Sequence, residues 1–150
     1  MKMCITSQKD NLTSRVGNVL GNVSRRGMME KRKILVVDDE RNSREGLSKI
    51  LIKDGYKVMA VKTGTVALDE TKKQNFDLII TDLKMPMVSG IDVLEKIKKE
   101  KANIRVIIVT AYGEVNSYLK AMTLGAFEYF NKPIKVNDLR HAINNALNES

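Results

Sequence analysis

The chain has little of several residue types that would point to particular classes of protein. Its 150 residues include one cysteine, one histidine, two prolines and no tryptophan. The single cysteine, Cys4, cannot form an internal disulfide, and no pair or cluster of residues has the spacing of a cysteine or histidine metal site. The sequence therefore excludes a disulfide scaffold within this chain and fits a reducing compartment.

Long apolar runs are also missing. No run approaches the roughly 20 residues needed to cross a bilayer, and the first residues, MKMCITSQKDNL, contain no apolar stretch of signal-peptide length. We therefore expect a cytoplasmic protein that does not contact membranes. The formal net charge of +8 permits acidic partners, but the lysines are widely spread and only 5% of the residues are aromatic. Nucleic-acid binding by this chain alone is not expected.

The chain divides into two parts of different character. Residues 1–30 are rich in Asn, Ser, Thr and Gly and show no sustained apolar period, so we expect a largely disordered extension. From residue 31 onward the chain is apolar enough to bury a core and has the size of one domain. We therefore place a single globular domain at residues 31–150.

Short β-rich runs alternate with stretches of helical spacing throughout that domain. The runs lie at residues 34–37, 57–61, 76–81, 104–109 and 126–130, and helical patterns lie around residues 47–51, 67–71, 91–97, 115–122 and 136–147. Five strands that alternate with five helices indicate an α/β fold, a doubly wound parallel sheet with helices on both faces. We expect the flavodoxin-like strand order 2-1-3-4-5.

In such a sheet, ligands bind beyond the carboxyl ends of the strands, so the residues just after each run are the informative ones. The second run, an edge strand in this order, is followed only by Lys62, Thr63 and Gly64. The residues that follow the other four runs are Asp38, Asp39 and Glu40; Asp82; Thr110 and Ala111; and Lys132 and Pro133. These four strands are neighbours, so their ends converge and make Asp82 the centre of a site.

Adjacent aspartates repel one another and are costly to desolvate, so a positive charge is expected beside Asp38 and Asp39. Carboxylates suit a hard divalent cation, Mg²⁺ or Mn²⁺, that also binds a phosphoryl oxygen. The ammonium of Lys132 and the hydroxyl of Thr110 would help to neutralise a phosphoryl group on Asp82. The backbone N–H groups of Ala111 and Lys84 would contribute in the same way.

Residues 33–148 resemble the receiver domains of bacterial two-component response regulators. The resemblance rests on the stretches VVDDE, TDLKMPMVSG, VTAYG and YFNKP, in this order and on these strand ends. The last part of the sequence is similar to receivers of the nitrogen-regulation type. In larger regulators these precede an ATPase domain and a DNA-binding domain, and we expect no such output domains within these 150 residues.

The resemblance implies a role for each site residue. Asp82 would accept a phosphoryl group from a sensor histidine kinase or phosphotransfer protein, and Lys132, before a cis Lys132–Pro133 bond, would contact that group. Asp39, Asp82 and the backbone carbonyl of Lys84 would bind Mg²⁺, with Asp38 acting mainly through water. The domain would act in a phosphorelay and would not be an enzyme beyond its own phosphorylation and dephosphorylation.

The sequence departs from the family pattern after Met85 and Pro86, where Met87, Val88 and Ser89 replace the common Gly-Met-Asp. Ser89 can still cap the next helix. The resemblance also places Lys84 and Tyr112 where receivers tune the lifetime of the phosphoryl group.

Receivers also imply a switch, here Thr110 and Tyr129. Period-two alternation places Tyr129 on the same strand face as Phe127 and Asn131. Phosphorylation would draw Thr110 toward the phosphoryl group and let Tyr129 turn inward. The surface of the fourth helix, fifth strand and fifth helix, with His141 nearby, would then bind a downstream protein or a second copy of the chain.

Several alternatives remain open from the sequence. Asp38 to Glu40 would fit a simple helix cap, and Thr110 a turn. His141 would suit a phosphohistidine carrier, but it lies off the apolar face of its helix. A haloacid-dehalogenase-type enzyme would use similar residues, although its Asp-x-Asp motif and cap domain are missing. A receiver that binds partners without phosphorylation is the remaining alternative.

Overall fold

A computed structural model of the chain describes residues 31–148, and the disordered extension expected at residues 1–30 lies outside them. The elements are β1 (Lys33–Val37), α1 (Arg41–Lys53), β2 (Lys57–Val61), α2 (Gly64–Lys73), β3 (Leu78–Thr81), α3 (Gly90–Glu100), β4 (Arg105–Thr110), α4 (Val115–Thr123), β5 (Glu128–Asn131) and α5 (Val136–Asn148). None of the helices in this part of the chain has the length and hydropathy of a membrane span.

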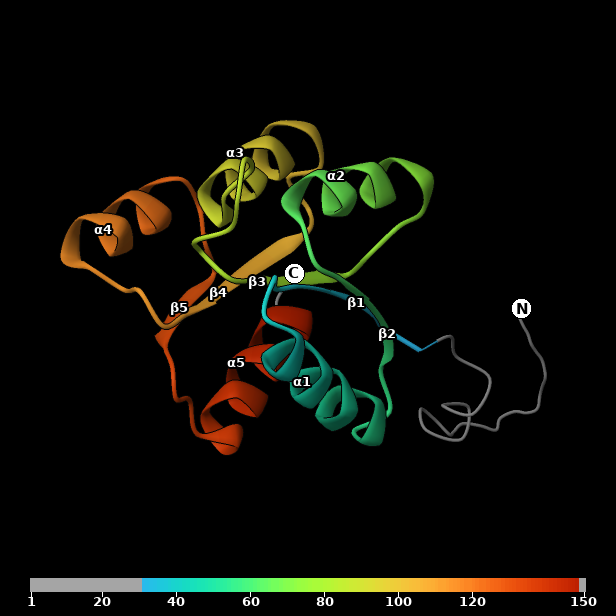
Figure 1. Cartoon of the computed structure of the whole chain (residues 1–150). Helices are drawn as coiled ribbons and strands as arrows, with labels where there is room; N and C mark the ends of the chain where they lie inside the picture. Colours follow the sequence, from blue (N-terminus) through green and yellow to red (C-terminus); the bar gives the residue numbers. More distant parts are fainter. Residues whose placement is uncertain (1–30, 149–150) are drawn as a thin grey trace. The chain divides into compact units, whose positions relative to one another are not determined.

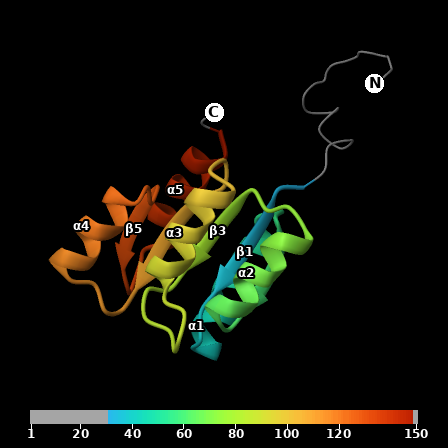
Figure 2. The same cartoon turned by 90° about the horizontal axis from the view of Figure 1, so that it is seen from above.

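The five strands form one parallel sheet in the order β2-β1-β3-β4-β5. Helices α1 and α5 cover one face, and α2, α3 and α4 cover the other (Figure 1). The view from above shows the second group of helices lying along the sheet (Figure 2). The α/β class, the doubly wound arrangement and the strand order predicted from the sequence are confirmed.

Two apolar clusters, one on each face of the sheet, form the core. In β1, for example, Leu35 and Val37 join the cluster beneath α2, α3 and α4, whereas Ile34 and Val36 join the cluster of α1 and α5. The central strands are therefore apolar on both sides, which is why the sequence shows continuous apolar runs instead of alternation. The polar residues that end these strands stand out against that background.

Local sequence signals account for where several helices begin and end. Gly55 and Gly125 follow α1 and α4 with positive φ angles of 101° and 103°, a conformation that glycine adopts without steric cost. Ser89 and Asp92 form a capping box at the start of α3. The carboxylate of Glu40 caps α1 by accepting from two backbone N–H groups of its first turn, so the helix-cap alternative holds for this one acidic residue.

Two strands are shorter than predicted. The third starts at Leu78 instead of residue 76, and the fifth starts at Glu128 instead of residue 126. The predicted shared face of Phe127 and Tyr129 is therefore wrong. Phe127 precedes β5 at a bend in the chain and packs with the α1 and α5 cluster, whereas Tyr129 packs against the opposite cluster. Period-two alternation holds only within the strand itself.

Candidate functional site

Asp38 and Asp82 lie side by side because their strands are neighbours in register. Val37, the last residue of β1, pairs with Thr81, the last residue of β3. The N–H of Asp82 donates to the carbonyl of Val37 at 2.9 Å, so the ladder continues one residue beyond the strands. The carboxylates of Asp38 and Asp82 thus lie at the carboxyl edge of the sheet, as the sequence predicted. Asp39, the next residue after Asp38, lies at the same edge.

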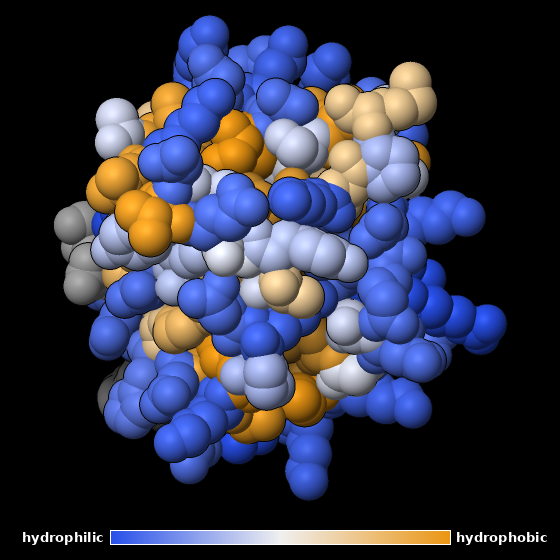
Figure 3. All heavy atoms as spheres, turned by 60° about the vertical axis from the view of Figure 1, so that its left-hand side comes forward, coloured by the Kyte–Doolittle hydropathy of each residue, from blue (hydrophilic) through white to orange (hydrophobic). Residues whose placement is uncertain are grey.

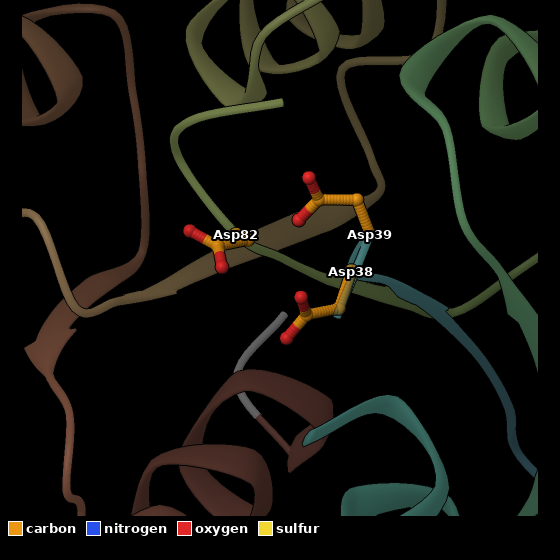
Figure 4. Close-up of side chains that lie close together, drawn as sticks. All are labelled: Asp38, Asp39 and Asp82. Atoms are coloured by element: carbon orange, nitrogen blue, oxygen red, sulfur yellow. The ribbon is translucent and has the colours of Figure 1, made fainter. Parts of the chain in front are cut away.

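The three aspartates spread from that edge in different directions. Asp38 points toward the layer of α1 and α5, Asp39 toward the layer of α2 and α3, and Asp82 lies to one side of both (Figure 4). One oxygen from each carboxylate lies within 4.8 Å of the others. Asp38 and Asp82 are buried, whereas Asp39 is exposed. This donor set fits a hard divalent cation that keeps several of its waters.

Lys132 supplies the positive charge expected beside these carboxylates. Its backbone N–H donates to the Thr110 carbonyl at 2.8 Å, which fixes the residue just beyond the end of β5. Its Nζ lies 2.8 Å from Asp38 Oδ2 and 3.2 Å from Asp82 Oδ2. The lysine therefore joins the two buried carboxylates, and the bond to Pro133 that follows is cis, as the resemblance implied.

Burial and charge act in opposite directions on this cluster. Burial raises the pKa of Asp38 above its ordinary value of 3.8, against hydrogen bonds from Lys132 and from the Glu40 backbone. Burial by itself would lower the pKa of Lys132, but the hydrogen bond and charge of Asp38 and then the charge of Asp82 outweigh it, so that pKa is raised. One ammonium group thus pairs with two buried carboxylates while Asp39 adds a third negative charge nearby, so the cluster favours additional positive charge.

An open cavity of about 850 Å³ adjoins the carboxylates. Its lining includes Asp39, Asp82 and Lys132 together with Lys84 and Ala111, the residues from which backbone N–H groups were expected. The Nζ of Lys84 lies 5.3 Å from the centre of the Tyr112 ring, so the loops after β3 and β4 are in contact across this space. The structure brings these predicted phosphoryl-binding residues together.

Thr110 is placed differently from the other candidates. It is fully buried at the end of β4, and its Oγ1 accepts a hydrogen bond from the Tyr112 N–H at 3.1 Å. Thr110 therefore lies beside the cavity and holds the β4–α4 loop, and it does not form part of the cavity wall. Its contact with a phosphoryl group stays a prediction, for which the hydroxyl still has its own proton to donate.

Tyr129, the second switch candidate, lies partly buried on the α4 side of the sheet. Its ring packs edge to face with Tyr118 of α4, with the ring centres 5.4 Å apart. Within the described residues, its buried hydroxyl has no hydrogen-bond partner. Burial raises the pKa of this tyrosine. The partly buried ring thus packs on α4 without a well-formed hydrogen bond at its hydroxyl.

Two residues of the first turn of α1 complete the site and were missed from the sequence. Ser43 Oγ lies 3.4 Å from Lys132 Nζ, and an Arg44 guanidinium nitrogen donates to the Asp38 carbonyl at 2.9 Å. Their position in the sequence, directly after the acidic run, could have indicated this role. The first turn of α1 follows the end of β1 and therefore lies at the same edge of the sheet as the aspartates. His141, by contrast, is exposed on α5.

Comparison with known proteins gives a consistent result. The profile of the response regulator receiver domain matches residues 34–144. The chain is 39% identical over 115 residues to the sporulation initiation phosphotransferase F of Bacillus subtilis, covering 77% of this chain and 93% of that protein.

Two solved structures are also similar. One is the response regulator protein TrrA of Thermotoga maritima in complex with Mg²⁺ and BeF, with 36% identity and a TM-score of 0.71, covering 77% of this chain and 99% of that one. The other is the beryllofluoride-activated NtrC4 receiver domain dimer in solution, with 34% identity and a TM-score of 0.73, covering 77% and 95%.

Proposed function

Because this chain belongs to the response regulator receiver domain family, we propose that Asp82 is the residue on which it accepts a phosphoryl group in signal transduction. The observation that carries the proposal is the convergence of Asp38, Asp39 and Asp82 at one sheet edge, with the ammonium of Lys132 paired to Asp38 and Asp82. Asp82 is the central member, since it borders the cavity and faces Lys132.

The proposed donor is the phosphohistidine of a sensor histidine kinase or phosphotransfer protein. An oxygen of Asp82 forms the new P–O bond while the P–N bond breaks, and the donor imidazole keeps that electron pair and takes up a proton. Asp82 is held in place for this step: Oδ1 accepts from the Leu83 N–H at 2.6 Å, and Oδ2 faces Lys132. Lys132 and the cavity-lining loops then contact the transferred group.

The acidic cluster supports a role for Mg²⁺ or Mn²⁺ in this transfer. Asp39, Asp82 and the backbone carbonyl of Lys84 would hold the ion, with Asp38 acting through water. The bound ion supplies positive charge that lets a phosphoryl dianion approach the carboxylates. The exposure of Asp39 and the excess of carboxylate over ammonium support this assignment.

We also propose that the domain occupies residues 31–150, with residues 1–30 as an extension, and works in the cytoplasm as part of a phosphorelay. Its catalysis is limited to its own phosphorylation and dephosphorylation. The match of the receiver profile to residues 34–144 supports the domain boundaries.

For output, we propose that phosphorylation shifts the population of two conformations of the α4, β5 and α5 surface. The half-buried Tyr129 ring, which packs on Tyr118, and the buried Thr110 hydroxyl are the parts that would move. Val115, Tyr118 and Leu119 of α4 are 74%, 44% and 54% exposed, and the space-filling view of this side shows apolar atoms among polar ones (Figure 3). A protein target or a second copy of the chain would bind there. The beryllofluoride-activated NtrC4 receiver domain, a relative, is a dimer.

Labelling with acetyl phosphate tests the phosphoacceptor. We expect Asp82→Asn to abolish metal-dependent labelling and Asp69→Asn, a change at an exposed aspartate of α2, to leave it intact. Full labelling of Asp82→Asn would refute the assignment, and labelling that persists in EDTA would refute the metal requirement.

An NMR comparison of the Mg²⁺-loaded domain with and without beryllofluoride tests the switch. We expect large shift changes in residues 115–131, beyond the immediate contacts of Asp82. Changes confined to the carboxylate cluster and its loops would contradict the proposed surface switch, while leaving the phosphoacceptor assignment unaffected.

A further inference from the structure

Met87 has a backbone conformation that its side chain does not favour. Its φ angle is 70°, in the left-handed region where a Cβ crowds the backbone and where glycine is the usual residue. Within the described residues it is the only non-glycine residue with a positive φ. A strained position of this kind persists only where the surroundings impose it, and such positions concentrate at functional sites.

The side chain of Met87 gains no packing that would offset this strain, since it is 96% exposed. Single exposed apolar side chains are ordinary on protein surfaces, and the backbone conformation is what sets this one apart. A glycine or an asparagine would satisfy the same turn with less strain and less exposed apolar surface. The presence of methionine therefore points to a contact outside the folded domain.

The loop that carries Met87 is held firmly on both sides. The Val88 N–H donates to the Pro86 carbonyl at 2.8 Å, and the Gly90 N–H donates to the Leu83 carbonyl at 2.8 Å. The side chain of Val88 packs closely over Gly64 of α2. Met87 is thus presented outward from an ordered turn, and its thioether can adapt to a partner surface at little further cost.

The position of the loop between β3 and α3 indicates which partner Met87 would contact. Lys84, Met85, Pro86 and Ser89, the neighbours of Met87 along the chain, line the cavity that contains Asp82. A protein that brings a phosphohistidine to Asp82 must approach through this opening. Its surface next to the histidine would therefore pass over the Met87 side chain.

We propose that Met87 is a docking contact for the phosphohistidine-bearing protein and inserts its thioether into an apolar depression beside that histidine. This inference rests on the proposed function of Asp82. Met87 does not touch the reacting atoms, so its effect is on recognition of the protein donor and not on the chemistry at Asp82.

The test compares two phosphoryl donors on the full chain. One is acetyl phosphate, which has no protein surface, and the other is an autophosphorylated sensor kinase that labels the wild-type chain. The variants are Met87→Asn, which tolerates the left-handed backbone but is polar, and Met87→Leu, which keeps an apolar side chain. Val66→Asn, at an exposed apolar residue of α2, is the matched control.

We expect Met87→Asn to lower the rate of transfer from the kinase about fivefold or more at subsaturating concentration, as loss of an interface contact does. Labelling by acetyl phosphate should stay at the wild-type rate, Met87→Leu should retain most of the kinase transfer, and Val66→Asn should match the wild type. The melting temperature of Met87→Asn should stay the same or rise.

Several results would overturn the docking role. These are an unchanged kinase rate in Met87→Asn, an equal loss with both donors, or a lowered melting temperature that shows Met87 to be part of the folded core. Failure of the proposed function gives a different signature, because Asp82→Asn would then still be labelled by both donors.

Discussion

The side chains of the site are governed by an imbalance of charge. One ammonium, that of Lys132, lies within 3.2 Å of two buried carboxylates, and the exposed Asp39 adds a third. A buried charge is costly unless it is paired, so the cluster is stable only with its lysine and gains from a cation. The excess of negative charge is unfavourable in the metal-free domain, and it favours the binding of a metal ion and, with that ion, of a phosphoryl group.

Asp38 should make the stability of the metal-free domain depend on pH. Burial raises its folded pKa above 3.8, so the folded state binds its proton more tightly than the unfolded state. This contribution is fully present below the unfolded pKa and is lost as pH rises through the folded pKa. In EDTA, urea unfolding should show the wild type losing stability relative to Asp38→Asn as pH rises above the unfolded pKa of Asp38. A gain in stability with rising pH would mean that the ion pair with Lys132 lowers the pKa of Asp38 more than burial raises it.

Metal binding should depend on Asp39 without the fold depending on it. Asp39 is exposed, so Asp39→Asn should keep the melting temperature in EDTA within about 2 °C of the wild type, as surface changes usually do. Mg²⁺ should stabilise the wild type by about 2.7 kcal/mol at a hundredfold excess over Kd, and this gain should be largely lost in Asp39→Asn. A full gain in the variant would remove Asp39 from the metal site; Asp69→Asn serves as the control.

The sequence identified the site residues better than it identified their contacts. Asp38, Asp82 and Lys132 follow apolar runs, and that position alone places them at one sheet edge. The direction of each side chain depends on packing, so the buried hydroxyl of Thr110 and the contact of Ser43 with Lys132 were not predictable. For Glu40 the sequence left the helix cap as an alternative, and the structure shows that its carboxylate caps α1.

At the scale of the elements, the start of α3 packs closely against the backbone of Asp82. A Cβ at Gly90, the first residue of α3, would lie 2.1 Å from the backbone carbonyl oxygen of Asp82. Backbone cannot yield as a flexible side chain does, so only glycine allows this approach. The sequence predicted the start of this helix through Ser89, but the closeness of the two segments is evident only in the fold.

Gly90→Ala should therefore destabilise the domain by about 2 kcal/mol or more, as overpacking of a tight site does. Gly46→Ala offers a matched comparison, because Gly46 lies in α1 and a Cβ added there would meet nothing within 4 Å. That change should stabilise the domain by about 0.5 to 1 kcal/mol through helix propensity. Equal effects in denaturant unfolding would show that the Gly90 contact is not restrictive.

For the molecule as a whole, the sequence was sufficient to predict the sheet. Apolar runs on β1, β3 and β4 require cover on both faces, and the uninformative end of the second run placed it at an edge. The ends of β3 and β5 were less predictable, because Phe76 and Phe127 are apolar residues that join the core from outside a strand. Apolar character does not distinguish a residue within a strand from a core residue next to the strand. Only the backbone hydrogen bonds of the fold make that distinction.

Residues 1–30 show no sustained apolar period in the sequence and precede the first strand, so we expect them to be dispensable for stability. Deleting them should leave the melting temperature within about 5 °C of the full chain, a shift equivalent to roughly 1 kcal/mol. Thermal unfolding of the two forms followed by circular dichroism measures this. A larger drop would show that the extension stabilises the core.

The central claim is that the phosphoryl group is carried by Asp82. The most direct measurement is a tryptic mass spectrum of the full chain after reaction with acetyl phosphate and Mg²⁺ and trapping of the acyl phosphate with borohydride. We predict one modified residue, Asp82, and no modification when the metal is removed with EDTA. Modification of Asp38 or Asp39 in place of Asp82 would contradict the account.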